Sequence, residues 1–167
     1  MTARACLLWP DARLRSAAAP VAEITDEVRG IWADMIDTMD AMPGYGLAAP
    51  QIGVGLRLVV VDCSTERGRA VRMANPMVVY SSEVMRSHEE GSPNLPLVSA
   101  IVVRPRAVTV RFVNAAGNVE DREFVHLWAT SVQHQIDHLN GRLYFDHLSA
   151  LKRKMLIARS EKLRKRG

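Results

Sequence analysis

The sequence predicts an α+β fold in which mostly antiparallel β-sheets surround a central α-helix, with further helices toward the two ends of the chain. Two observations predict it. Short β-branched runs cluster in the middle of the sequence, whereas apolar residues at three- and four-residue spacing occur toward both ends. Strands and helices that segregate along a chain in this way are typical of the α+β class.

Length and composition favour one globular domain. The chain has 167 residues, 48% hydrophobic and 24% charged, so we expect residues 1–167 to form a single domain rather than a disordered or fibrous chain. Two cysteines, Cys6 and Cys63, are too few for a disulfide framework. No apolar run reaches the ~18 residues of a membrane span, and the N-terminal apolar patch is shorter than a signal-peptide core. We therefore expect a cytoplasmic protein without membrane association.

The first predicted element is a helix that follows Thr25, a suitable N-cap residue, and ends at Pro43-Gly44. A glycine-rich loop at 44–53 comes next, and a buried strand at 56–61 follows it. The middle of the chain is then expected to contain a bent or edge strand at 71–80, a loop at 88–98, a short strand at 101–103, and a hairpin of strands 107–113 and 119–125.

Two helices are predicted after the hairpin. One covers residues 127–140 and is the central helix, and the other follows the N-cap residue Ser149. The segment 149–167 is a basic C-terminal helix, for which we expect Leu151, Met155 and Ala158 to face inward. Residues 152–167 contain eight Lys and Arg and one glutamate, a net charge of +7. Such a segment is either a solvated helix face or an element that contacts RNA.

His134 and His138 give the first indication of chemistry. Residues four apart on a helix share a face with their Cβ atoms ~5–6 Å apart, so the two imidazoles can bind one divalent metal ion. This pair is the ligand half of the His-Glu-x-x-His pattern of metallohydrolases. Here Gln135 replaces the glutamate, and a carboxamide cannot accept the proton of a metal-bound water.

Three segments together are more specific than the histidine pair. They read GYGLAAPQ at 44–51, EGSPNLP at 90–96 and QHQIDHLNG at 133–141. In this order they resemble the motifs GxGLAAxQ, EGCLS and QHExDH of peptide deformylase, and the resemblance covers nearly the whole chain. It implies the fold of that family and a cytoplasmic bacterial metallohydrolase of protein biosynthesis, which removes the formyl group from the N-terminal methionine of nascent proteins.

The resemblance also implies a set of site residues. In the family, one cysteine and two histidines bind a divalent metal, generally Fe²⁺ with Zn²⁺ or Ni²⁺ as substitutes, and a glutamate is the general acid/base. The glutamine of the first motif and the backbone N–H after the cysteine donate to the oxyanion. Matching positions here are Gly46, Gln51, His134 and His138, whereas Ser92 replaces the cysteine, Pro93 the N–H donor and Gln135 the glutamate.

Each departure has a chemical consequence. A serine hydroxyl stays protonated at neutral pH and is a poor substitute for a thiolate ligand. Positioned acid/base catalysis contributes ~10²–10⁴-fold, which Gln135 cannot supply. Proline has no N–H, and loss of one oxyanion donor lowers turnover by ~10²–10³-fold.

Further residues surround this site in the resemblance. Glu90 is expected to pair with Arg104, and Asp137 to orient a metal-binding histidine, although a purely structural role is open for all three. The substrate-binding positions that the family implies are Tyr45, Leu95 and Leu127.

We therefore expect a deformylase-like protein whose deformylase activity is lost or severely impaired and whose cleft binds peptide N-termini, formylated or free. The alternative is an active metal-dependent deformylase or related amide hydrolase that uses a weakened His134/His138 site, with water or Ser92 in the third position. The first case allows no bound metal, and the second requires Fe²⁺, Zn²⁺ or Ni²⁺. The family also implies a ribosome contact through the basic C-terminal helix. The sequence does not determine the oligomeric state.

Overall fold

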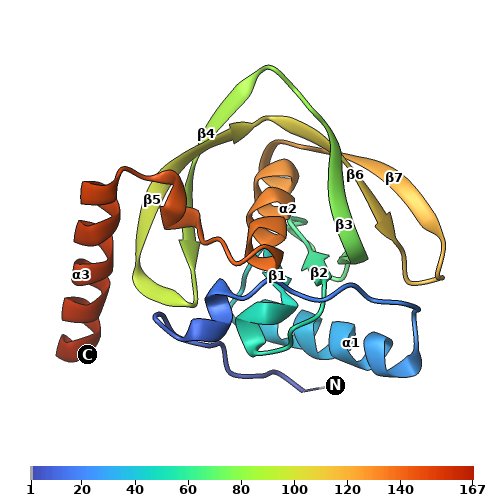
Figure 1. Ribbon diagram of the computed structural model, residues 1–167, viewed down its shortest axis with the longest axis horizontal. Coiled ribbons are helices and arrows are strands. Elements are labelled where there is room, and N and C mark those ends of the chain that lie inside the picture. The colour runs from blue at the N-terminus through green and yellow to red at the C-terminus, as the bar shows by residue number, and fades with distance from the viewer. Residues whose placement is uncertain (1) are drawn as a thin grey trace.

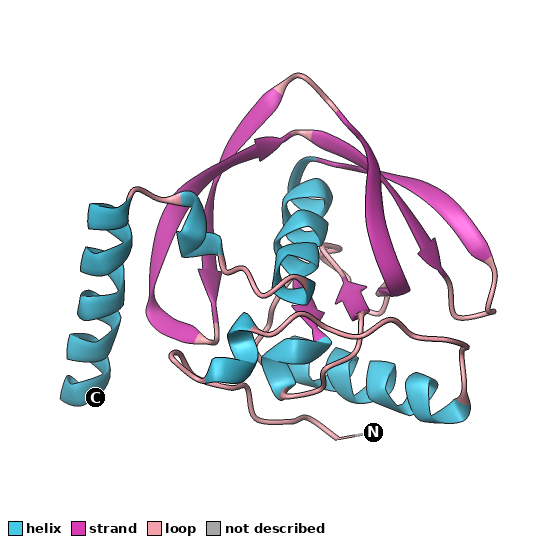
Figure 2. Cartoon of the chain, in the orientation of Figure 1, coloured by secondary structure: helices cyan, strands magenta, loops and turns pink. Residues whose placement is uncertain are grey.

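The structure is a computed structural model that describes residues 2–167. Among these residues, two antiparallel sheets surround helix α2 (His126–Leu139), while α1 (Asp26–Ala41) lies beneath them and α3 (Ala150–Arg166) stands at one side (Figures 1 and 2). The predicted α+β class, with a central helix that carries both histidines, is confirmed.

The larger sheet has the strand order β1-β2-β3-β6-β7, and every neighbouring pair is antiparallel. Its strands are β1 (Gly46–Ala48), β2 (Leu58–Val61), β3 (Val71–Ser81), β6 (Ala107–Val113) and β7 (Val119–Val125). The predicted hairpin is present with continuous register, and the Asn114 side chain accepts hydrogen bonds from the backbone of Ala116 and Asn118 in its turn. Asn114 thereby fixes the turn between β6 and β7.

The smaller sheet corrects the sequence-based prediction of a loop at 88–98. Most of these residues belong to β4 (Met85–Ser92) and β5 (Leu95–Pro105), which pair from Met85↔Pro105 to Ser92↔Leu95. Burial alternates along β4, but its buried positions, Glu90 and Ser92, are polar. The strand is not recognisable from hydrophobic alternation because its inward face lines a polar site.

The glycine-rich segment is also more regular than predicted. It contains β1 and a 3-10 helix, η2 (Ala49–Ile52), which place Gln51 in the interior at 1% exposure. Helix α1 begins as expected, because the Thr25 hydroxyl oxygen accepts a hydrogen bond from Val28 N (3.2 Å), and its Trp32 side chain is fully buried.

Helix α3 shows a different inward face from the predicted one. Leu151 and Met155 are 68% and 63% exposed, and Ala158 is exposed as well, so that prediction is wrong. Leu156 and Ile157 pack instead on the apolar cluster that contains Phe145, and the hydroxyl of the buried Ser160 donates to Pro96 O (2.7 Å). The helix contacts the edge strand β5, so these contacts decide which of its faces is buried. In the part of the chain that the structure describes, no helix combines the length and apolarity needed to cross a bilayer.

Candidate active site

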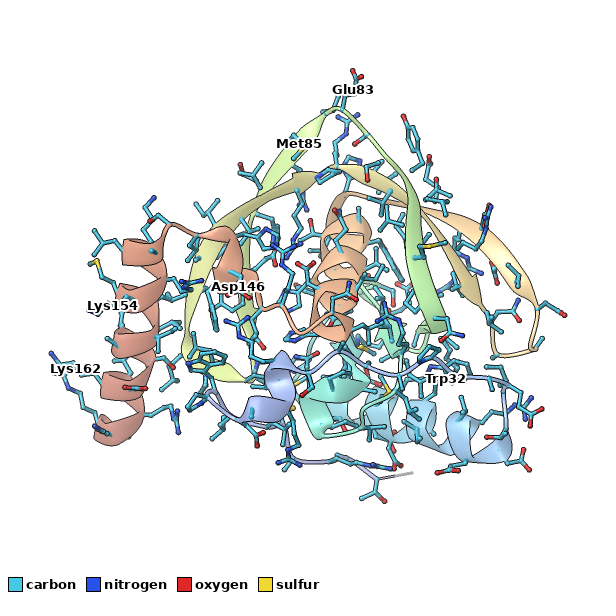
Figure 3. The ribbon with its side chains drawn as sticks, viewed as in Figure 1. Trp32, Glu83, Met85, Asp146, Lys154 and Lys162 are labelled. Atoms are coloured by element: carbon cyan, nitrogen blue, oxygen red, sulfur yellow. The ribbon has the colours of Figure 1, made fainter. Side chains whose placement is uncertain are left out.

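A cleft of about 530 Å³ lies between α2, β4 and the residues around β1. Strand β4 turns alternate residues toward α2, and on α2 residues at i, i+3, i+4 and i+7 share the face that lines the cleft. The three motif segments converge here, since the lining includes Gly46, Gln51, Glu90, Ser92, Pro93, His134 and Gln135. Figure 3 shows the side chains that fill the space between α2 and the neighbouring strands.

The two histidines meet at the inner end of the cleft. The Nε2 atoms of His134 and His138 are 3.2 Å apart, and the residues are 7% and 1% exposed. The Glu90 carboxylate accepts from His134 Nδ1 (2.8 Å), which leaves His134 Nε2 as the atom that faces its partner. The Tyr144 ring stacks on His134 with centroids 5.9 Å apart. Burial, together with the neighbouring His134, holds the pKa of His138 well below its usual 6.5, so His138 is neutral.

Arg104 organises the buried charges beside the histidines. Its guanidinium donates to both Glu90 oxygens (2.7 and 3.0 Å) and to Asp137 (2.9 Å), and it is 4% exposed. Burial alone would raise the pKa of Glu90, but the hydrogen bonds from His134 and Arg104 lower it to about 2. Glu90 is therefore ionised at neutral pH.

Asp137 has different contacts from those expected. Its carboxylate accepts from Arg104 and from His147 Nε2 (2.8 Å), while the orienting contact to a histidine of the pair comes from Glu90. Asp137 therefore acts on the pair through Arg104. Sequence reasoning missed the contacts of His147 and Tyr144, because no spacing pattern links them to the motifs.

The histidine pair has the geometry of two metal ligands. Two nitrogen ligands of a tetrahedral ion at ~2.0–2.1 Å lie ~3.3 Å from each other, close to the 3.2 Å separation found here. Within residues 2–167, no group of three His, Cys, Asp or Glu side chains is placed to hold a metal ion. Ser92 is the position at which the motif resemblance implies the third protein ligand.

The Ser92 hydroxyl has hydrogen-bonding contacts with Asn94 and Gln51. It donates to Asn94 Oδ1 (3.0 Å) and accepts from Asn94 N (3.2 Å) and, at the long limit of 3.5 Å, from Gln51 Nε2. Since a hydroxyl has one proton and two lone pairs, these contacts use its full hydrogen-bonding capacity. The residues present therefore fit a metal ion at two positions, and the Ser92 hydroxyl is not free to act as a third ligand.

Asn94 holds this arrangement together, and sequence reasoning did not single it out, although it stands in the second motif. Its Nδ2 donates to Leu7 O (2.6 Å) and Gln51 O (3.3 Å), which turns Oδ1 toward Ser92 and toward Gln51 Nε2 (2.7 Å). The other terminal atom of the Gln51 side chain is also held in place, because Oε1 accepts a hydrogen bond from Ala48 N (2.9 Å). We call Gln51, Ser92 and Asn94 the amide–hydroxyl cluster.

Gly46 allows β1 to approach α2 closely. A Cβ at this position would lie 2.6 Å from Ser131 Oγ and 2.7 Å from Gln135 Nε2. Gln135 faces the cleft, and its buried Oε1 has no hydrogen-bond partner among the described residues. Gly46 and Gln135 thus lie close together in the lining of the cleft.

The expected substrate-binding residues divide into two groups. Tyr45 and Leu127 line the cleft. Leu95 does not line it: the side chain is fully buried in an apolar cluster with Leu14 and Phe145, because β5 turns it away from the cleft. The assignment of Leu95 as a substrate-binding residue is therefore wrong.

Comparison with known proteins identifies the family of this chain. The family described as "Polypeptide deformylase" matches residues 4–154. A "Peptide deformylase" of Rhodopseudomonas palustris (strain TIE-1) is 42% identical over 171 residues, which cover all of this chain and 98% of that protein. Another, from Acinetobacter baumannii (strain SDF), is 41% identical and covers 94% of this chain and 89% of its own length.

Solved structures give the same result. A peptide deformylase from Legionella pneumophila superposes with a TM-score of 0.92 at 38% identity, covering 98% of this chain and 96% of that one. One from Ehrlichia chaffeensis, in complex with actinonin, has a TM-score of 0.91 at 30% identity and covers 97% and 98%. A Met-Ala-Ser-bound deformylase from Acinetobacter baumannii has a TM-score of 0.83 at 27% identity and covers 88% and 99%. This chain belongs to the peptide deformylase family.

Proposed function

We propose that this protein binds the N-terminal end of a peptide, formylated or free, in the deformylase cleft, and that its capacity to hydrolyse the formyl amide is lost or severely impaired. The observation that carries the proposal is the amide–hydroxyl cluster. It occupies both the Ser92 hydroxyl and the Gln51 amide, and Ser92 is the position at which the motif resemblance implies a cysteine ligand.

The remaining groups can bind and orient a peptide but do not move a proton. Gln135 Oε1 is free to accept from the N–H of a formyl amide or a free amine, but a carboxamide does not titrate near neutral pH. A ligand carbonyl that approaches Gln51 Nε2 has to compete with Asn94 Oδ1 at 2.7 Å. Pro93 lines the cleft without an N–H to offer. Binding is thus supported by more of this chain's own residues than hydrolysis is.

The second candidate is an active metal-dependent deformylase or related amide hydrolase, and the comparisons support it more directly. Its relatives carry the name "Peptide deformylase", and the histidine separation suits a shared metal ion. This candidate requires that a divalent ion be held by His134 and His138, with solvent or a reoriented Ser92 as the third ligand. The two candidates therefore differ in metal retention and in turnover.

One experiment separates the candidates. Protein purified without added metal is analysed for Fe, Ni and Zn, and is then loaded anaerobically with Fe²⁺ or Ni²⁺ and assayed on formylated tripeptides that begin with Met or Gln. The same is done for a variant with Ser92→Cys, Pro93→Leu, Asn94→Ser and Gln135→Glu. We expect less than stoichiometric metal and negligible turnover for the wild type, and both properties to appear in the variant.

The control is the same variant with His138→Ala, which removes one metal ligand and should abolish the restored activity. A wild type that retains about one metal per chain through dialysis against chelator, and that hydrolyses either peptide as fast as the variant, would establish the second candidate instead.

We also propose that α3 contacts ribosomal RNA, which would place the protein in the cytoplasm. The support is the net charge of +7 at residues 152–167 and the exposure of that charge: Lys154 and Lys162 project away from the body of the protein (Figure 3). Lys154→Glu with Lys162→Glu should weaken co-sedimentation with ribosomes, and salt should weaken it for the wild type. Lys→Arg at the same positions is the matched control. Sedimentation that neither salt nor charge reversal changes would refute this contact.

A further inference from the structure

Beside His134, the lining of the cleft includes polar side chains from two elements, among apolar residues such as Leu127 and Val98. Strand β4 contributes His88, two residues before Glu90 on the same inward face, and α2 contributes Thr130 and Ser131, one turn before His134. We call His88, Thr130 and Ser131 the polar wall.

Two side-chain atoms of residues that line the cleft lack partners. His88 Nδ1 and Gln135 Oε1 are both buried without a hydrogen bond to any residue that the structure describes. Both residues line the cleft. An unpaired buried polar atom is unfavourable, so this pair of atoms indicates that a hydrogen-bonding ligand completes the site.

A positive charge stands directly behind the polar wall. Arg86, on the inward face of β4, donates from Nη1 to Thr130 Oγ1 (3.1 Å). It forms no ion pair with a carboxylate of residues 2–167, whereas Arg104 on the neighbouring strand is fully paired. Because Thr130 Oγ1 accepts from Arg86, its hydroxyl proton is directed to another acceptor, and a ligand oxygen in the cleft can provide one.

We propose that the polar wall makes this cleft select a peptide whose first side chain ends in a carbonyl oxygen, as in glutamine or glutamate, over one that begins with methionine. The inference rests on the proposed binding of a peptide N-terminus beside His134 and Gln135. In this proposal, the first side chain of the ligand occupies the part of the cleft that His88 on β4 and Thr130 on α2 line. In that space, a carbonyl oxygen can accept from Thr130 Oγ1–H and from an N–H of His88.

Methionine fits this wall less well for a physical reason. Its thioether sulfur is only a weak acceptor, so it would cover His88 and Thr130 without pairing them. Glutamine and glutamate have unbranched side chains of similar length, so the comparison changes polarity and little else. Sites built to hydrogen-bond a ligand discriminate strongly against analogues that lack the bond, and we expect at least about a tenfold difference in Kd.

The test measures the Kd of free tripeptides X-Ala-Ser by calorimetry, with X as methionine, norleucine, glutamine or glutamate. The proteins are the wild type and the double variant His88→Leu/Thr130→Val, which makes the wall apolar. Ser87→Val adds an apolar side chain at the exposed, outward-facing position next to His88 and is the matched control.

We expect the wild type and Ser87→Val to prefer the glutamine or glutamate peptide by at least about tenfold, and the double variant to reverse this preference toward methionine and norleucine. Arg86→Gln distinguishes the two polar ligands, because it should weaken glutamate more than glutamine if the guanidinium attracts a carboxylate.

Tighter binding of the methionine or norleucine peptide by the wild type, or a preference that the double variant leaves unchanged, would overturn this inference while leaving the proposed function standing. Absence of binding for all four peptides, in a wild type with a cooperative unfolding transition, would overturn both.

Discussion

Replacing Asn94 by aspartate changes one terminal group in the amide–hydroxyl cluster and little of its shape. The Oδ1 position could still accept from Ser92 and Gln51. The other terminal atom would change from an N–H donor into an oxygen that faces Leu7 O, 2.6 Å away, and Gln51 O, 3.3 Å away. Asn94→Asp therefore converts two attractive contacts into repulsive ones at a position that is 0% exposed.

The size of the effect follows from burial. A buried charge that is left without a compensating partner lowers the free energy of unfolding by about 3–5 kcal/mol. For a chain of this length that corresponds to a fall in Tm of roughly 6–20 °C. Asn94→Ser removes the same hydrogen bonds without adding charge and should be milder, with a loss of about 1–3 kcal/mol.

Urea unfolding at pH 7, followed by tryptophan fluorescence, measures these changes. Trp9 is a suitable probe, because its backbone N–H donates to Asn94 O (2.8 Å). Asn118→Asp is the control, since Asn118 is exposed in the β6–β7 turn and the change should stay within about 0.5 kcal/mol.

An Asn94→Asp variant within about 1 kcal/mol of the wild type would refute the reasoning. It would mean that the Asn94 amide does not hold Leu7 and Gln51 as described. In that case the Ser92 hydroxyl would not be fixed by Asn94, and the case against Ser92 as a third metal ligand would lose its structural basis.

Three further outcomes test other parts of the site and fold. Arg104→Met leaves the buried Glu90 and the partly buried Asp137 without their shared cation and should lower the free energy of unfolding by about 3–5 kcal/mol in urea. A loss below about 1 kcal/mol would contradict this. Burial would raise the pKa of Asp62, but hydrogen bonds from Ser64 and from Arg69 N lower it below its usual value, so the Asp62 carboxylate stabilises the fold above about pH 4 and this stabilisation is lost as the pH falls. Asp62→Asn should therefore flatten the acid limb of the stability–pH curve. An unchanged acid limb would count against this interpretation. Gly46→Ala should displace the Gln135 side chain and lower the free energy of unfolding by about 1–3 kcal/mol. Calorimetry should also show weaker peptide binding by this variant. A variant with wild-type stability and affinity would show that β1 can move away from α2.

Features that depend only on residues close together in the sequence were predictable. The N-caps Thr25 and Ser149 and the turn at Asn114 depend on neighbours within a few residues, and the two helices and the hairpin that they mark are present. His134 and His138 share a helix face because four residues make about one turn, and the structure brings them to 3.2 Å. The family was also readable, because its motifs are short and ordered.

Contacts between distant segments were not predictable in this way. Strand β4 was missed because Glu90 and Ser92 occupy buried positions with polar side chains, which only their partners on other elements make acceptable. The prediction of the buried face of α3 was wrong. The hydrogen bond of Ser160 and the contact with β5 determine that face, whereas the prediction used only the apolar residues of the helix.

The sequence by itself predicted the fold class, the family and the two histidines that share a helix face. The tertiary structure alone decided that Asn94 engages the Ser92 hydroxyl and the Gln51 amide, that Glu90 rather than Asp137 orients His134, and that Leu95 belongs to the core. The physical reason is that hydrogen-bond partners are set by which atoms the fold brings within about 3 Å. For Asn94, those atoms belong to segments up to 87 residues away in the chain.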